Sequence, residues 1–141
     1  MGKIIVGVDA SDHATRALRW ALEEARVRGA EVEVVHAVHQ PDIAAMPAVL
    51  PMPTHEQLEE AGHQVVDELL AEVDTQDVTV TRDVRSGGAA GVICRRAEDA
   101  DLVVVGARGL GGFRGLLLGS VTQQVVAHSP KPVVVVVPED R

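Results

Sequence analysis

Cysteine and aromatic residues are scarce in this chain of 141 residues. The single cysteine, Cys94, excludes an intrachain disulfide, and its apolar neighbours Val92 and Ile93 favour a place for it in the core. The aromatic residues are Trp20 and Phe113 alone, so the chain has almost no side chains on which nucleic-acid bases could stack. The core must therefore be aliphatic, built mainly from Ala, Val and Leu.

The charge balance is acidic, with a formal net charge of −8 at pH 7. A protein of this charge repels a phosphate backbone, so we expect neither nucleic acid nor an anionic membrane as a partner. No apolar run approaches the ~20 residues needed to cross a bilayer. The opening of the chain also lacks the pattern of a secretory signal. These features predict a cytoplasmic protein.

The chain does contain a regular alternation of apolar runs and amphipathic segments. Short, nearly continuous apolar runs are typical of strands covered on both faces, and they predict strands at 3–9, 31–38, 101–106 and 132–137. Segment 78–84 alternates valine with polar residues and predicts a less buried strand. Helical periodicity fills the intervals: one helix ends at Gly29, one follows a capping box at Thr54–Gln57, and two shorter ones span 87–97 and 120–128.

Strands that alternate with helices predict an α/β fold, in which a five-stranded parallel sheet carries helices on both faces. The length and the 46% of hydrophobic residues suit a single domain over residues 1–141. Ligands of such sheets bind beyond the carboxyl ends of the strands, where the strand order reverses. If the first and fourth strands are neighbours, Asp9 and Gly106 come together there.

The segment His39–Pro53 interrupts this pattern with four prolines in fifteen residues. Proline at this density excludes a regular helix or a central strand. A loop of this length is often functional or mobile, and a plain spacer fits equally well. The sequence therefore assigns no role to this segment.

The most informative stretch is Gly106–Thr122, in which six of seventeen residues are glycine. It follows a buried strand and leads into the helix that begins near Ser120. Glycine-rich turns let backbone N–H groups approach an anion, and a helix start adds further N–H groups and a favourable dipole. Phosphate is the usual anion at such a place, and the alternative is a loose surface loop.

Two common phosphate loops do not fit this stretch. A P-loop requires a lysine after its last glycine, and no lysine occurs between Gly106 and Thr122. A dinucleotide fingerprint follows the first strand, whereas Asp9–Asp12 follows it here and contains no glycine. The predicted phosphate site therefore lies late in the chain.

The spacing of Gly106, Gly109 and Gly119-Ser120 fits the pattern G-x2-G-x9-G-[ST]. With the opening KIIVGVDASDHATRALRWAL and the ending GSVTQQVVAHSPKPVVVV, the chain resembles the universal stress protein family, in its ATP-binding branch, from Lys3 to Val137. The resemblance implies a Rossmann-like sheet in the strand order 3-2-1-4-5. It also implies ATP as ligand, a role as a sensor or switch in the stress response, and a homodimer formed through the last strand, Val133–Val137. Mg²⁺ held through the phosphates is a further candidate.

The resemblance also implies roles for individual residues. Gly7 and Asp9, at the end of the first strand, lie against the nucleoside, with Asp9 on the adenine or ribose side, and Val38 packs near the adenine. The other implied nucleotide-binding residues surround the ribose and phosphates: Gly106, Ala107, Arg108, Gly109, Leu110, Gly111, Gly112, Gly119, Ser120, Val121 and Thr122.

Catalysis has little support in the sequence. Asp9 and Asp12 could hold Mg²⁺ or orient a water, although Asp12 is also a good helix cap. Arg108 and Arg114 could screen phosphates or be solvated. We find no paired nucleophile and base and no metal-ligand spacing. Four hypotheses stay open: an ATP-dependent switch, a slow ATPase, a nucleotide-independent dimeric interaction protein, and a site for AMP or a cyclic nucleotide.

Overall fold

A computed structural model describes residues 2–39, 51–109 and 118–138 of the chain. Strands and helices alternate along it: β1 (Lys3–Gly7), α1 (Asp12–Arg28), β2 (Glu31–Val38), α2 (His55–Ala71), β3 (Val80–Ser86), α3 (Ala89–Ala97), β4 (Leu102–Gly106), α4 (Ser120–His128) and β5 (Val133–Val136). The predicted order of elements is confirmed, and β2 and α4 have the predicted bounds. The third strand lies two residues later than predicted, because its ends are set by pairing with β2 from Val80 to Ser86 rather than by its own pattern.

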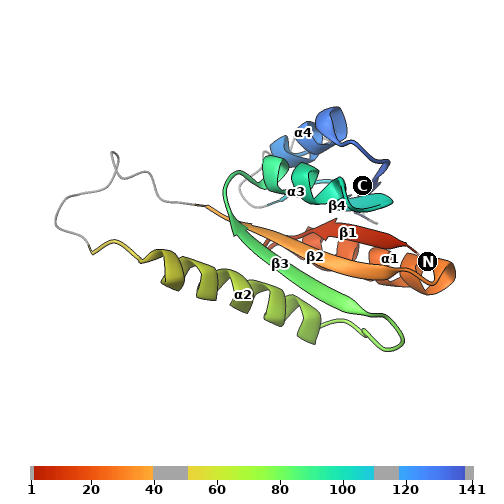
Figure 1. Cartoon of the computed structure of the whole chain (residues 1–141), viewed down its shortest axis with the longest axis horizontal. Helices are drawn as coiled ribbons and strands as arrows, with labels where there is room; N and C mark the ends of the chain where they lie inside the picture. The colour runs from red at the N-terminus through yellow and green to blue at the C-terminus, as the bar shows by residue number, and fades with distance from the viewer. Residues whose placement is uncertain (1, 40–50, 110–117, 139–141) are drawn as a thin grey trace.

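The strands form one parallel sheet in the order β3-β2-β1-β4-β5, which confirms the predicted fold. Helices α1 and α2 cover one face, and α3 and α4 cover the other (Figure 1). Side chains alternate between the two faces, so Ile4 and Val6 of β1 join the core beneath α1 and α2, whereas Ile5 joins the core beneath α3 and α4. Both cores are aliphatic, as the composition predicts.

Helix α1 buries its predicted apolar face and ends at the predicted glycine. Gly29 has a φ of 67°, the left-handed conformation that favours glycine after a helix. The prediction that Asp12 caps this helix is wrong, because the N-cap residue is Ser11. Asp12 lies in the first turn instead, where a carboxylate still interacts favourably with the helix dipole.

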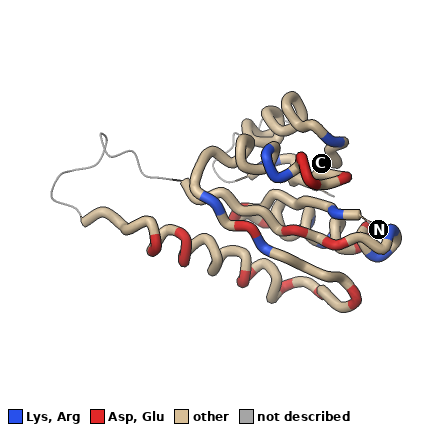
Figure 2. Tube along the Cα trace, viewed as in Figure 1, with Lys and Arg blue, Asp and Glu red and all other residues tan. Residues whose placement is uncertain are grey.

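Helix α2 begins with the predicted capping box. The Gln57 N–H donates to Thr54 Oγ1 at 3.0 Å, and the Thr54 N–H donates to Gln57 Oε1 at 2.8 Å. Further along, Gly62 is buried so closely that a Cβ would lie 2.7 Å from a γ carbon of both Val38 and Val84. Glycine therefore lets α2 pack directly on β2 and β3. Figure 2 shows acidic residues spaced along this helix.

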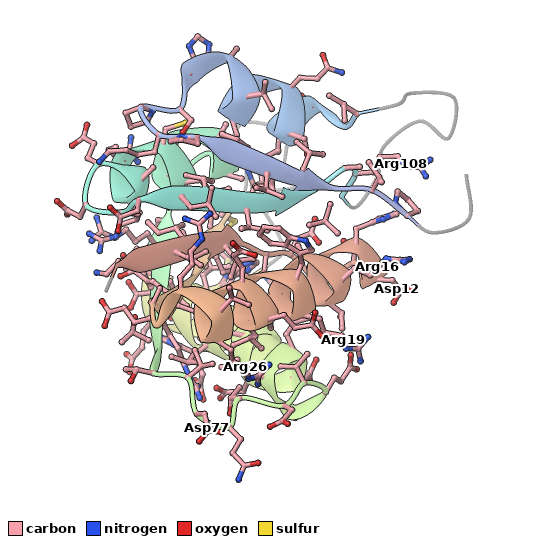
Figure 3. All side chains as sticks on the ribbon, turned by 90° about the vertical axis from the view of Figure 1, so that its right-hand side faces the viewer. Asp12, Arg16, Arg19, Arg26, Asp77 and Arg108 are labelled. Atoms are coloured by element: carbon pink, nitrogen blue, oxygen red, sulfur yellow. The ribbon has the colours of Figure 1, made fainter. Side chains whose placement is uncertain are left out.

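Two arginines of α1 join it to the connection that follows α2. Arg26 Nη2 donates to the Asp74 carbonyl oxygen at 2.6 Å, and Arg19 Nη2 donates to the Glu72 carbonyl oxygen at 3.3 Å. Figure 3 shows Arg19 and Arg26 on the side of α1 that faces α2. In the same connection, Asp77 has a φ of 68°, a conformation that aspartate adopts more readily than most residues.

The prediction that Cys94 is a core residue is wrong. Val92 and Ile93 are buried in the core beneath α3, but Cys94 is half-buried and lies outside both core clusters. At 3.6 residues per turn, position 94 turns away from the sheet-facing side of the helix. Partial burial still raises the pKa of the Cys94 thiol.

Two further points concern the chain as a whole. None of the helices in the described ranges is long and apolar enough to cross a membrane. The predicted proline-rich loop lies mainly at 40–50, outside the described residues.

Candidate functional site

A cleft opens at the carboxyl ends of β1 and β4. These strands are neighbours at the point where the strand order reverses, which is where open α/β sheets bind ligands. Five elements and the turns beside them contribute lining residues: Gly7, Val8, Asp9, Ser11, Ala14, Ala89, Ile93, Val105, Gly106, Arg108, Gly109, Gly119, Ser120, Val121 and Thr122. The fold thus brings Asp9 and Gly106 to one cleft, as the topological argument predicts.

The N-terminus of α4 forms one wall of this cleft. Its N-cap residue is Gly119, which has no side chain to bond the first helical N–H groups. Those N–H groups have no acceptor within the helix. Ser120, Val121 and Thr122 therefore place backbone donors and the positive end of the helix dipole at the cleft wall. This is the arrangement that binds anions at helix starts.

The turn after β4 is joined to α4 by hydrogen bonds. Thr122 Oγ1 donates to the Gly106 carbonyl oxygen at 2.7 Å, and the Gly119 N–H donates to the Ala107 carbonyl oxygen at 2.7 Å. A Cβ on Gly119 would lie 3.3 Å from the Cα of Arg108. Close backbone packing is therefore a reason for glycine here, whereas the sequence argument gave only the approach of an anion.

Three helix N-termini meet at this cleft. Helices α1, α3 and α4 all supply lining residues from their first turns or N-caps, and their N-cap residues, Ser11, Gly88 and Gly119, make no side-chain cap bond. By contrast, α2 has a complete capping box and supplies no described residue to the lining. Partial positive charge from three helix starts is therefore concentrated at one place, which favours an anionic ligand.

The carboxylate of Asp9 is engaged with the residue that precedes α1. Its Oδ1 accepts hydrogen bonds from the Ser11 N–H at 2.8 Å and from the Ser11 hydroxyl, which forms an Asx turn. The Ser11 hydroxyl is therefore directed to Asp9 rather than to the helix. On the other side, Asp9 Oδ2 lies where a Cβ on Gly109 would collide with it. Asp9 thus packs between the start of α1 and the glycine turn.

Apolar side chains form another part of the lining. A Cβ on Gly7 would lie 2.5 Å from Ile93 Cδ1 and 3.4 Å from Val105 Cγ1, so Ile93 and Val105 close over the end of β1. Neither was predicted as a lining residue, and the same holds for Val8, Ser11, Ala14 and Ala89. Periodicity marks Ile93 as inward-facing, but it cannot distinguish a contact with the sheet from a contact with a cleft.

Several predicted residues lie away from the lining or outside the described ranges. Val38 is buried at the end of β2, and its side chain faces Gly62 of α2 rather than the cleft. Ala107 is also buried, and its N–H donates to the Val136 carbonyl oxygen at 3.0 Å. Four others lie outside the described residues: Leu110, Gly111, Gly112 and Arg114.

Charged side chains are few in the described lining. Arg108 is half-buried there, and Figure 3 shows it at the same end of the molecule as Asp12 and Arg16 of α1. Asp12 is exposed and does not line the cleft. Within 2–39, 51–109 and 118–138, no three His, Cys, Asp or Glu side chains are grouped so that they could hold a metal ion.

Comparison with known proteins identifies the family. The profile of the Universal stress protein family matches residues 1–137. The chain therefore belongs to the universal stress protein family. It is 37% identical over 137 residues to a universal stress protein of Thermus aquaticus, covering 94% of this chain and 96% of the relative. It is 36% identical over 137 residues to one of Mycolicibacterium smegmatis, covering 96% of this chain but 45% of the relative. The chain thus spans about half the length of several mycobacterial relatives.

Solved structures of universal stress proteins share the fold. UspA of Lactobacillus plantarum superimposes with a TM-score of 0.76 at 24% identity, covering 95% of this chain and 96% of that one. A universal stress protein in complex with cAMP gives a TM-score of 0.66 at 25% identity, covering 95% of each chain. The Archaeoglobus fulgidus protein in complex with dAMP gives 0.64 at 26% identity, covering 96% of this chain and 97% of that one.

Proposed function

We propose that this universal stress protein binds an adenine nucleotide, with ATP as the preferred ligand, and that occupancy of the cleft acts as a switch in the stress response. The observation that carries the proposal is the meeting of three helix N-termini without side-chain caps at one cleft. Uncapped helix starts bind anions, and the cleft lies at the place where α/β sheets take nucleotides.

The two kinds of lining suit the two ends of a nucleotide. Backbone donors at Ser120, Val121 and Thr122 are suited to phosphate oxygens. Ile93 and Val105 offer an apolar surface of the kind on which a base can lie. Mg²⁺, where present, would be held mainly through the phosphates, because Asp9 is already bonded to Ser11. The cAMP and dAMP complexes of two relatives support an adenine ligand for this chain.

Slow hydrolysis of ATP at the same site is the second candidate. Asp9 is the one carboxylate in the described lining, and its Oδ1 accepts two hydrogen bonds from Ser11. A general base must lie within hydrogen-bond reach of the attacking water and accept its proton, and the engagement of Asp9 with Ser11 disfavours that role. We therefore expect a binding protein with at most weak turnover.

The ligand can be identified directly. The protein is purified without added nucleotide and denatured, and any adenine compound released is identified by chromatography. We expect ATP near one per chain. ADP or AMP would favour slow hydrolysis or a different native ligand. If nothing is released and added ATP does not raise the melting temperature, as a native-state ligand must, the nucleotide-independent hypothesis replaces this one.

We further propose that two copies pair through β5. This strand forms one edge of the sheet, its residues Val133–Val136 are all half-buried, and Val137 beyond it is exposed. An apolar edge strand with open backbone groups invites pairing with another strand. A second copy would cover both the backbone edge and these valines.

A further inference from the structure

A charged residue is buried in the middle of β2. Glu33 is only 6% exposed and lies on the sheet face that α3 and α4 cover, between apolar neighbours of the same strand. Burying a carboxylate is unfavourable unless it is paired and hydrogen-bonded. The position therefore requires a partner, and Figure 2 shows charged residues of both signs on the strands around it.

That partner comes from α3. Arg96 Nε donates to Glu33 Oε2 at 2.9 Å, and Arg96 Nη2 donates to Glu33 Oε1 at 2.9 Å. The same guanidinium lies 2.9 Å from Asp83 Oδ2 of β3, and Lys3 Nζ of β1 lies 3.7 Å from Glu33 Oε1. The hydrogen bond to Glu33 raises the pKa of Arg96, so the guanidinium stays charged. One side chain of α3 is thus tied to charged residues of β2 and β3, beside a lysine of β1.

Arg96 lies on the same side of α3 as two cleft residues. Ala89 and Ile93 precede it by seven and three residues, spacings that share one helix face, and both line the cleft. We infer that the Arg96–Glu33 pair is the positioning element of the cleft, because it fixes the rotation and axial position of α3 and thereby where Ala89 and Ile93 stand. This inference rests on the proposed nucleotide site.

A bidentate pair is suited to such a role. Two parallel hydrogen bonds fix direction as well as distance, whereas an apolar contact allows sliding and rotation. Helix α3 has only nine residues, and its sheet-facing side chains other than Arg96 are small or aliphatic: Ala89, Val92, Ile93 and Ala97. Since a buried pair adds little net stability compared with apolar packing, we attribute it to positioning.

The test compares Arg96→Met with Arg95→Met. Both remove one guanidinium from the same helix, but Arg95 is exposed and does not line the cleft. Affinity for ATP and for AMP is measured by calorimetry at a temperature at which circular dichroism shows every variant folded. We expect Arg96→Met to weaken binding at least fivefold and Arg95→Met to change it less than twofold. The affinity of Arg96→Lys should fall between those of the two methionine variants, because lysine keeps the positive charge but cannot donate the two parallel hydrogen bonds of a guanidinium.

Hydrogen exchange provides a readout that does not depend on the ligand. In Arg96→Met, amides of 89–97 should lose more protection than amides of 80–86, because the variant lowers global stability by leaving Glu33 unpaired but frees α3 in particular. Unchanged affinity together with unchanged exchange in α3 would overturn the inference. If the wild type binds no adenine nucleotide, the proposed function fails, and exchange in α3 alone then decides whether Arg96 positions the helix. Should Arg96→Met not fold, Arg96→Lys is judged by the same two measurements.

Discussion

At the scale of the residue, Gly109 stands where a single added methyl group would meet a carboxylate. A Cβ there collides with Asp9 Oδ2, and Asp9 is itself held by Ser11. Asp9 cannot move without disturbing the start of α1, and Gly109 cannot move without disturbing the turn after β4. A substitution at Gly109 therefore tests whether nucleotide binding depends on the shape of this turn.

We predict that Gly109→Ala combined with Ser120→Ala weakens adenine-nucleotide binding at least tenfold, about 1.4 kcal/mol. The methyl group displaces the turn from Asp9, and the second change removes a hydroxyl at the start of α4. Isothermal titration calorimetry measures the affinity. Gly91→Ala is the control, because Gly91 is exposed on α3 and, among the described residues, its Cβ would meet Arg95 Nη1 alone, at 3.5 Å. Wild-type affinity in the double variant would contradict this account of the phosphate site.

Thr122 provides a second test at this scale. It is 4% exposed, and its hydroxyl donates to the Gly106 carbonyl oxygen. Thr122→Val keeps the shape but removes the donor, so we expect the free energy of unfolding to fall by about 1–2 kcal/mol. Urea denaturation measures it, with the exposed Thr81→Val as control, for which we expect a change within about 0.5 kcal/mol. Equal stability of the two variants would show that this bond does not hold the turn.

At the scale of the element, the four described helices differ in how they begin. Helix α2 satisfies its first turn with its own capping box, whereas α1, α3 and α4 have N-caps without such a bond and start at the cleft. Capping contributes about 1 kcal/mol to a helix. At the other three helix starts, the first-turn N–H groups receive no side-chain acceptor from the N-cap residue, at the place where the proposed ligand supplies acceptors.

Replacing Gly62 or Gly91, which both lie inside helices, by alanine should change the free energy of unfolding in opposite directions. Gly62→Ala gains about 1 kcal/mol of helix propensity, but its methyl group would lie 2.7 Å from carbons of Val38 and Val84, and such overpacking costs about 1–3 kcal/mol. Gly91 is exposed, so Gly91→Ala should stabilise the protein by about 0.5–1 kcal/mol. Urea denaturation of both variants measures the difference. A stabilising Gly62→Ala would mean that α2 does not pack closely on the sheet.

At the scale of the whole molecule, pairing through β5 can be tested by charge. We expect Val135→Lys to shift the molar mass, measured by light scattering after size exclusion, from dimer toward monomer, because lysine on an edge strand opposes pairing. Val27→Lys makes the same chemical change at an 82% exposed site on α1 and should leave the mass unchanged. Circular dichroism confirms that both variants are folded, and a dimer that survives Val135→Lys would contradict the proposal.

Local chemistry accounts for what could be predicted from the sequence. The capping box at Thr54 and the left-handed Gly29 depend on residues a few positions apart, and both appear as predicted. The prediction for Asp12 was wrong because the neighbouring Ser11 is an equally good N-cap residue. The prediction for Cys94 was wrong because one step along a helix, from Ile93 to Cys94, turns the side chain out of the core. Strand β3 shifted because pairing with β2 sets its ends.

By itself, the sequence determined the elements, the parallel α/β class and the place of the glycine turn, since periodicity, caps and turn residues act over short distances. Only the tertiary structure decided that three uncapped helix starts share one cleft, that Ile93 and Val105 line it, and that Glu33 pairs with Arg96. These features depend on strand order and on the register of helices against the sheet. An inward-facing residue has the same sequence signature whether it meets the core, a ligand or a buried charge.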